Sequence, residues 1–256
     1  MLSIIIPTLN EEDYLPLLLK SISRAAAKGE KEDLSSLPKN QGFEIDLEII
    51  VADAGSTDKT IEIAKSYSCR IAKGGLPGKG RNEGAKLARG DLLLFLDADL
   101  VLPKDFLRIF LKEFKDKNLD IASTDLEFIS KKKIYKIGAK LCNFYYNLTQ
   151  HFLPYITECI LVKKDIHDKI GGFDEKAIIL EDFDYVRRIA KIGKFGHLTS
   201  VKFYTSARRL EKDGLIRTLL RYILANIHLS FWGPVKSDIL DYKFSHYSKN
   251  QKNEVK

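Results

Sequence analysis

The sequence predicts an α/β fold in which a Rossmann-like, mostly parallel sheet is flanked by helices and followed by a C-terminal helical appendage. Short unbroken apolar runs alternate along the chain with segments whose apolar residues recur at helical spacing. Unbroken apolar strands are typical of parallel sheets that helices cover on both faces. With 45% apolar and 30% charged residues among 256, the composition is that of an ordinary globular protein.

Four strands and three helices are predicted in the first hundred residues. The strands are 3–6, 47–52, 69–72 and 92–96. A helix is expected from about residue 14 to 25, a second after the turn at 53–58, and a third over 81–88. The polar stretch 28–42 predicts a long solvated loop, and 242–256 a frayed, lysine-rich tail.

Ligands of open parallel sheets bind beyond the carboxyl ends of the strands, so the segments that follow each strand are the candidates. Asp97 and Asp99 come directly after the most apolar strand. Two carboxylates that flank a small residue can converge on Mg²⁺ or Mn²⁺, which then bridges them to phosphate oxygens. Two solvated aspartates in a turn are the alternative, but the position at a strand end favours a metal.

Two further segments are compatible with nucleotide binding. Asp53 can hydrogen-bond a nucleobase or a ribose hydroxyl, or it can simply cap the helix that follows. Lys79 and Arg81 lie among glycines at a predicted helix start, which suits a diphosphate, although an ordinary surface loop is equally consistent. The spacing is not that of a P-loop.

Taken in order, these segments resemble family 2 glycosyltransferases, which have the GT-A fold. The resemblance rests on residues 4–12, 51–60, 81–84, 94–99, 171–175 and 181–182. It covers roughly residues 2–210 and implies a transferase domain over 1–210, an amphipathic helical region over 211–241 and a tail over 242–256. The chain departs from the family in two places: Ala54 stands where many members have an acidic residue or glycine, and the loop 28–42 is long.

The resemblance also implies roles for individual residues. The nucleotide-sugar donor would contact Pro7, Thr8, Asn10, Glu11, Asp53, Lys79, Arg81, Asp97 and Glu181. Asp97 and Asp99 would hold Mg²⁺ or Mn²⁺, with Asp99 as the direct ligand, and Asp182 would be the catalytic base. An alternative role for 181–184 is simply that acidic residues favour a helix N-terminus.

The chemistry of sugar transfer agrees with these roles. A departing nucleoside diphosphate gathers negative charge, which a divalent cation and arginines neutralise. An acceptor hydroxyl is a weak nucleophile, so a carboxylate must take its proton. Arg208 and Arg209, after a strand predicted at 201–204, can grip the diphosphate or form a solvated basic turn; a similar Ser-x-Arg-Arg segment occurs in some family members.

The net charge of +7 predicts an anionic partner. Basic residues are spread among acidic ones without a recognisable binding module, so we expect no nucleic acid. Helix 214–230 carries an apolar stripe and ends at Phe231 and Trp232, and 131–140 is lysine-rich. These features fit a peripheral membrane contact, although such stripes ordinarily face the core.

The expected function is therefore metal-dependent, inverting transfer from a UDP- or GDP-sugar to a hydroxyl of a glycan or lipid-linked acceptor. A polyprenyl-phosphate sugar synthase is the alternative, because an ionised phosphate acceptor would not need Asp182. A non-catalytic nucleic-acid-binding protein is remote, and a pyrophosphorylase is set aside because 7–11 lacks its glycine-rich loop. Three scattered cysteines and the absence of a signal-like N-terminus predict a cytoplasmic protein. The peripheral membrane contact would then be at the inner face of the cell membrane.

Overall fold

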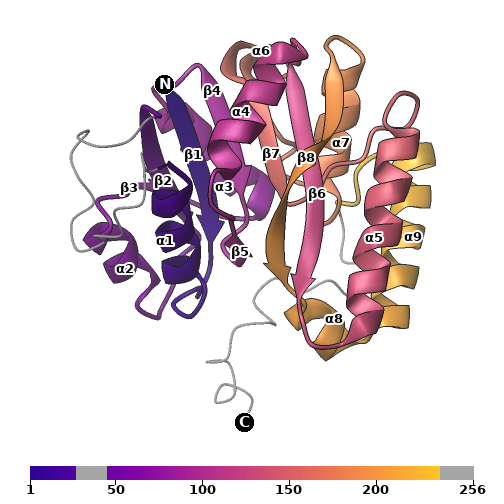
Figure 1. Cartoon of the computed structure of the whole chain (residues 1–256), viewed down its shortest axis with the longest axis horizontal. Helices are drawn as coiled ribbons and strands as arrows, with labels where there is room; N and C mark the ends of the chain where they lie inside the picture. The colour runs from indigo at the N-terminus through magenta and orange to yellow at the C-terminus, as the bar shows by residue number, and fades with distance from the viewer. Residues whose placement is uncertain (27–44, 237–256) are drawn as a thin grey trace.

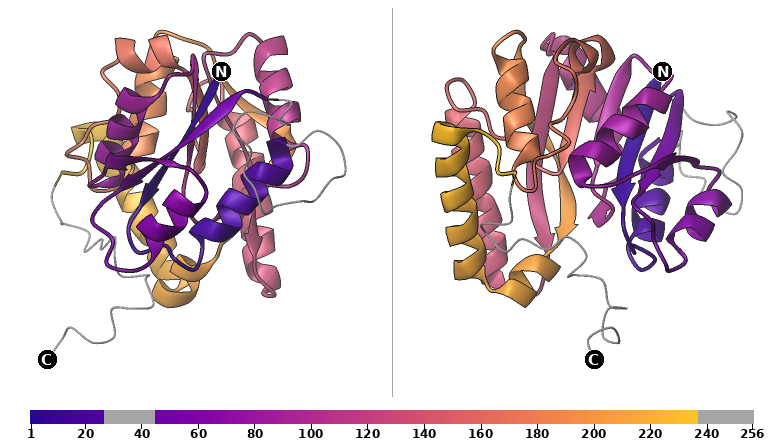
Figure 2. Two further views of the ribbon diagram at one scale, coloured as in Figure 1. Left: turned by 90° about the vertical axis from the view of Figure 1, so that its left-hand side faces the viewer. Right: turned by 180° about the vertical axis from the view of Figure 1, so that it is seen from behind.

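In the computed structural model, residues 1–26 and 45–236 form one eight-stranded mixed sheet with helices on both faces (Figures 1 and 2). These are the residues that the structure describes, with the Leu219 side chain excepted. The strand order is β3-β2-β1-β4-β7-β6-β8-β5. The predicted loop at 28–42 and tail at 242–256 lie outside the described residues.

The first half of the chain builds the parallel part of the sheet. Its elements are β1 (Leu2–Thr8), α1 (Leu15–Ala26), β2 (Leu47–Asp53), α2 (Thr60–Ser66), β3 (Arg70–Lys73), α3 (Pro77–Leu87) and β4 (Leu92–Leu96). Strand β1 pairs in parallel with both β2 and β4, and β2 with β3. All four predicted strands are present, and their carboxyl ends meet at one edge of the sheet.

The second half completes the sheet with strands of both directions. Its elements are β5 (Leu100–Val101), α4 (Phe106–Asp116), β6 (Ile121–Ile129), α5 (Lys133–Thr149), β7 (Cys159–Lys163), α6 (Lys164–Lys169), α7 (Glu181–Ala190), β8 (Phe195–Ser206), α8 (Arg208–Asp213) and α9 (Leu215–Trp232). Strand β7 runs antiparallel to its neighbours β4 and β6. The start of β7 therefore reaches the same edge as the end of β4.

The glycine-rich segment differs from the prediction of a loop that leads into a helix near residue 81. Helix α3 begins at Pro77, whose fixed φ suits the first turn and whose missing N–H needs no partner there. Most of the glycines thus lie inside the helix. A Cβ on Gly80 would come within 3.3 Å of Pro7, and one on Gly84 would collide with Ile5. These glycines let α3 lie close on β1.

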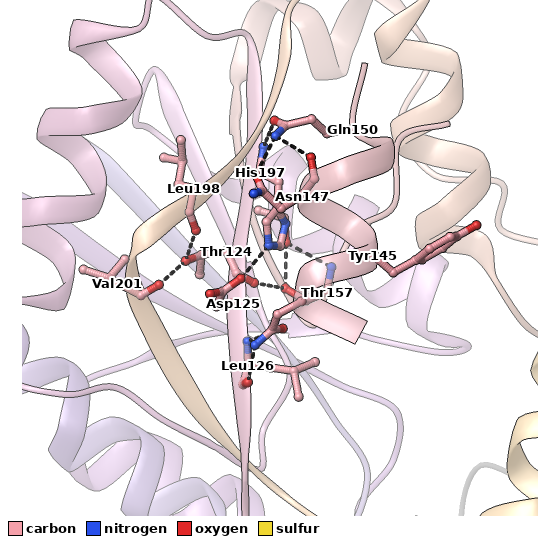
Figure 3. A network of polar contacts seen from close by, with 12 residues as sticks. Thr124, Asp125, Leu126, Tyr145, Asn147, Gln150, Thr157, His197, Leu198 and Val201 are labelled. Carbon is pink, nitrogen blue, oxygen red and sulfur yellow. Dashed lines mark hydrogen bonds and ion pairs between the residues drawn. The ribbon is translucent and has the colours of Figure 1, made fainter. Parts of the chain in front are cut away.

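Helix α5 is attached to the sheet by polar contacts (Figure 3). Asn143 accepts a hydrogen bond from the Leu126 N–H and donates one to the Leu126 carbonyl. Just past the end of the helix, the Gln150 side chain accepts a hydrogen bond of 2.9 Å from the His197 N–H. The His197 ring in turn lies 2.8 Å from Asp125. The helix face that meets β6 and β8 is therefore partly polar.

Candidate active site

The loops after β1 and β2 are joined by hydrogen bonds that fix Asp53 and Asn10. The Asp53 carboxylate accepts bonds from the backbone N–H groups of Gly55 and Ser56 at 2.8 and 2.9 Å. It also accepts one from the Thr8 hydroxyl. Asp53 therefore organises its own turn, as in the capping alternative, and its contact with a nucleotide stays a prediction.

Asn10 lies where the β1 loop crosses the β2 loop. Its φ of 55° is in the left-handed region, which asparagine tolerates better than most residues. Its side chain accepts a hydrogen bond from the Thr57 N–H at 2.8 Å, while its own N–H donates to Ser56. Pro7 is half-buried just before this crossing. These hydrogen bonds join the two loops at the carboxyl edge of the sheet.

Arg81 lies buried between two acidic residues from different elements. Its guanidinium is 2.8 Å from Asp97 at the end of β4 and 2.6 Å from Glu181 at the start of α7. Only 4% of its side chain is exposed. Burial would lower the pKa of Arg81, but the charges of Asp97 and Glu181 hold it above its ordinary value. Arg81 thus connects α3, β4 and α7, whereas Lys79, two residues earlier, is exposed.

Replacing Arg81 with methionine is expected to lower the free energy of unfolding by about 3–5 kcal/mol, because it leaves carboxylates in a buried site without their cation. Thermal or urea unfolding measures this loss. Lys86→Met is the matched control, since it removes an exposed ion pair with Glu83 and should change the stability far less. Equal losses in the two variants would contradict the role of Arg81.

A second arginine, Arg208, holds the other aspartate of the Asp97–Asp99 pair. Its Nε lies 3.1 Å from Asp99, and its two terminal nitrogens contact both oxygens of Glu11 at 2.7 and 3.0 Å. The Tyr14 ring packs against the guanidinium at 4.5 Å from the ring centroid. Burial raises the pKa of Asp99, as does the charge of Asp97, and Arg208 opposes both. Arg208 therefore occupies the acidic site as an internal cation.

Arg209 points to the other side of the segment, toward α9. It donates a hydrogen bond of 2.6 Å to the Tyr222 hydroxyl. Its charge also acts on Asp99 and Glu158. The two consecutive arginines thus donate hydrogen bonds to different partners, although the charges of both act on Asp99.

Glu158, just before β7, is an acidic residue that motif reasoning missed. Its backbone carbonyl accepts a hydrogen bond from the Asp97 N–H. Its Oε2 is buried and has no hydrogen-bond partner in the described structure. Burial, reinforced by the charges of Asp99 and Asp97, raises its pKa to about 8. The signal in the sequence is an acidic residue directly before an apolar strand. Glu158 lies at the carboxyl edge of the parallel strands only because β7 is antiparallel to β4.

Asp182 lies beside the Arg81 ion pairs at the start of α7. Burial raises its pKa to about 7, the negative charge of Glu181 adds to this, and Arg81 opposes it. Its carboxylate accepts a hydrogen bond of 2.8 Å from the Phe183 N–H. Asp184 is turned away and pairs with Arg188 at 2.7 Å, as expected from its position two residues further along the helix.

The turn before α7 is held against α3 by Asn82. Its side chain accepts a hydrogen bond from the Phe173 N–H at 2.8 Å and donates one to the Phe173 carbonyl. Gly172, at φ 71°, passes so close to Asn82 that a Cβ there would collide with it. This contact fixes the segment that leads to Glu181 and Asp182.

Comparison with known proteins identifies the fold and the family. The model of glycosyl transferase family 2 matches residues 3–173. The chain belongs to glycosyl transferase family 2. This confirms the resemblance seen in the sequence and places the chain in a family of sugar-transferring enzymes.

Individual members of family 2 are similar over part of the chain. Poly(ribitol-phosphate) beta-N-acetylglucosaminyltransferase TarS of Staphylococcus aureus is 33% identical over 114 residues, which are 41% of this chain and 17% of TarS. The crystal structure of S. aureus TarS 1–349 with UDP has a TM-score of 0.61 at 19% identity, and the match covers 90% of this chain and 72% of that one. Glucosyl-3-phosphoglycerate synthase of Mycobacterium tuberculosis, with Mn²⁺ and UDP-glucose, gives 0.59 at 17% identity, over 93% and 80%.

The matched regions show that this family 2 chain has the GT-A fold, as predicted. The chain spans less than a quarter of the length of its first curated relatives, TarS and the poly(ribitol-phosphate) beta-glucosyltransferase of Bacillus spizizenii.

The carboxylate oxygens at this site are suitable ligands for a hard divalent cation. Among the described residues, Arg81, Arg208 and Arg209 lie close to six carboxylates. These are the carboxylates of Glu11, Asp97, Asp99, Glu158, Glu181 and Asp182. The excess of acidic groups, and the guanidinium held at Asp99, indicate a place where positive charge is stabilised. No three His, Cys, Asp or Glu side chains of the described residues lie close enough to form a ready-made metal cage. A cation would therefore have to share its coordination with a ligand.

Proposed function

We propose that the chain transfers a sugar from a nucleoside diphosphate donor, a UDP- or GDP-sugar, to an acceptor hydroxyl with inversion at the anomeric carbon. One observation carries this proposal: Arg81 joins Asp97 of the strand-end acidic pair to the Glu181–Asp182 pair. The proposed metal ligand Asp97 and the proposed base Asp182 would thus both lie near the buried guanidinium of Arg81. The transferase domain would comprise residues 1–210, with 211–241 as an appendage.

The protein groups divide the work of such a reaction. Asp97 and Asp99 would hold Mg²⁺ or Mn²⁺, which neutralises charge on the departing diphosphate. The hydrogen-bonded loops around Asn10 and Asp53 would contact the nucleoside. Lys79, Arg208 and Arg209 would supply positive charge to the diphosphate. Asp182, with a pKa near 7, is suited to take the proton of the acceptor hydroxyl. Direct displacement needs no covalent intermediate on the protein.

The donor can be identified by a screen. We expect a UDP- or GDP-sugar, together with Mn²⁺, to raise the melting temperature of the chain, because a ligand that binds only the folded state stabilises it. The dTDP-sugars, nucleotide-free sugars and Mn²⁺ alone serve as comparisons. If no nucleotide-sugar changes the melting temperature or is hydrolysed, the proposed donor class is wrong.

A second candidate is transfer to a polyprenyl phosphate, and the exposed apolar faces of α5 and α9 favour a lipid acceptor. The two reactions differ in their need for a base, because a phosphate acceptor is already ionised. Asp182→Asn should therefore stop transfer to a hydroxyl acceptor but leave transfer to polyprenyl phosphate within about tenfold. Assays with both acceptors separate the candidates.

We place the reaction in the cytoplasm, at the inner face of the membrane, as expected for a donor that is a cytoplasmic nucleotide-sugar. The three cysteines are free thiols in the structure, which is consistent with a reducing compartment. No described helix is both long enough and apolar enough to cross a bilayer.

A further inference from the structure

Two helices at one edge of the molecule expose rows of large apolar side chains. Helices α5 and α9 both lie at the side farthest from β3 and run in the same direction (Figures 1 and 2). On α5 and just after it the exposed residues are Ile134, Ile137, Leu141, Phe144, Leu148 and Phe152. On α9 they are Ile216, Leu220, Ile223, Leu224, Ile227, Phe231 and Trp232. The spacing of three and four makes each row a continuous stripe along its helix.

The stripe on α5 faces outward because the opposite side of the helix is fixed to the sheet. Tyr135 and Ala139 are buried there, and Asn143 makes two hydrogen bonds to the backbone of Leu126. Phe144, by contrast, is 67% exposed. An ordinary amphipathic helix buries its largest apolar residues and exposes its polar ones. Helix α5 instead exposes large apolar side chains along much of its length, in addition to its lysines.

Helix α9 has the same arrangement. Its inward positions include small or polar residues such as Thr218 and Ala225, and Asn226 lies within hydrogen-bond distance of Arg187 on α7. Leu229 is buried, but Ile216, Leu220, Ile223, Leu224 and Ile227 are exposed, and Phe231 at the end of the helix is 77% exposed. The apolar stripe predicted from the sequence therefore faces solvent at these five positions. Scattered single apolar residues are normal on a surface, but two contiguous stripes mark an interaction surface.

The charge around the stripes indicates the sign of the partner. Residues 131–157 and 214–237 contain no Asp or Glu, although the chain has 35 acidic residues in all. The first of these segments carries five exposed lysines just before α5 and along its first half: Lys131, Lys132, Lys133, Lys136 and Lys140. Arg217, also exposed, lies in the first turn of α9. Apolar rows flanked by basic side chains are complementary to an interface that is apolar inside and anionic outside.

We infer that α5 and α9 together form a docking surface for an anionic phospholipid membrane. Both helices would lie in the interface, with their apolar stripes among the acyl chains and the lysines against phosphate headgroups. A second copy of the chain is a poorer occupant, since a two-fold interface would place this basic surface against itself. Membrane docking would bring a lipid-linked acceptor to the active site, and this part of the inference rests on the proposed function. The docking itself does not depend on it.

Vesicle sedimentation with the full chain tests the inference. We expect the wild type to co-sediment with vesicles of phosphatidylcholine and phosphatidylglycerol, and much less with phosphatidylcholine alone. High salt should weaken the binding, because it screens the lysines. Leu141→Glu with Phe144→Glu, and Ile223→Glu with Leu224→Glu, should each lower the partition onto anionic vesicles at least about tenfold. Leu17→Glu is the matched control, at a site on α1 that is 53% exposed, and should bind like the wild type.

The outcomes separate this surface from the catalytic proposal. Circular dichroism and the melting shift with donor establish that each variant is folded and competent, independently of lipid. Failure of the wild type to bind anionic vesicles would overturn the docking surface, even if donor turnover is normal. So would equal binding by the glutamate variants, or a dimer in light scattering that these substitutions dissociate. If the glutamate substitutions abolish vesicle binding, the docking surface is supported even when no nucleotide-sugar donor is found.

Discussion

Asp182→Asn is expected to lower the rate of transfer to a hydroxyl acceptor by roughly 10²- to 10⁴-fold while donor binding changes little. Asparagine keeps the shape of aspartate and an oxygen that can accept the Phe183 N–H, but it cannot take a proton. In the proposed site the donor would contact other residues, so its affinity should be nearly unchanged. Initial rates with saturating donor, together with calorimetric binding of the nucleoside diphosphate, make the measurement.

The pH dependence of transfer gives this prediction a second readout. Burial and Glu181 raise the pKa of Asp182 to about 7, and only the ionised carboxylate can accept a proton. Turnover should therefore rise with pH through about 7 and then level off, falling about tenfold per unit on the acid side. The residual activity of Asp182→Asn should lack this step. Wild-type rates that decrease through the same range would exclude Asp182 as the base.

The stability of the same variant distinguishes lost chemistry from lost folding. A carboxyl whose pKa is higher in the folded chain than in the unfolded chain favours folding less once it ionises. Above pH 7 the charged Asp182 therefore costs stability, and this cost shrinks progressively as the pH falls from about 7 toward the pKa of about 4 that an aspartate has in the unfolded chain. Asparagine removes it, so the variant should melt about 2–4 °C higher at pH 8, equivalent to about 1 kcal/mol. A lower melting temperature would point to a structural role.

Local patterns in the sequence identified the parallel half of the sheet and the residues at its strand ends. Unbroken apolar strands that helices cover on both faces form a parallel sheet, in which the carboxyl ends of the strands lie at one edge. Asp53 and Asp97 could therefore be placed at that edge. The reversal of β7 is not encoded in local periodicity, because a buried strand reads the same in either direction. Glu158 is not predictable for this reason: it precedes its strand, whereas the ligand sites of parallel sheets are expected after the strands.

The partners of the charged side chains were also beyond the sequence. Arg208 and Glu11 are 197 residues apart, and only the fold brings them together. The sequence similarly shows an apolar stripe on α9 but not which way it faces, since that depends on what the rest of the chain offers to cover it. Periodicity reports an amphipathic helix; burial is decided by tertiary packing.

Removing divalent cations with a chelator is expected to lower transfer by about 10²- to 10³-fold, because the developing charge on the diphosphate then lacks its main counter-charge. Restoring Mn²⁺ or Mg²⁺ should restore activity, while Ca²⁺, which prefers longer and more numerous oxygen contacts, should restore less. Activity unaffected by exhaustive chelation would show that the aspartates of this chain serve another purpose, as they can when arginines neutralise them.

Arg208 makes the cation dependence more specific. In the free protein its guanidinium pairs with Asp99 and Glu11, so a cation that binds Asp99 has to compete with it. A donor diphosphate offers Arg208 a new bidentate partner and would release the aspartate. Donor and cation should therefore bind cooperatively: Mn²⁺ should bind weakly to the free chain and more tightly with nucleoside diphosphate, and by linkage the reverse holds too.

Arg208→Gln tests this competition by removing the internal cation. Titration of Mn²⁺, followed by the loss of the free-ion signal in electron paramagnetic resonance, should show at least about tenfold tighter binding to the donor-free variant than to the wild type. The enhancement by nucleoside diphosphate should shrink in the variant, because little remains to be released. Arg108→Gln, which removes an exposed arginine paired with Asp105, is the control and should leave Mn²⁺ affinity unchanged. If Arg208→Gln binds donor-free Mn²⁺ no better than the wild type, then Arg208 does not hold the cation site closed, and the ion pair with Asp99 has only a structural role.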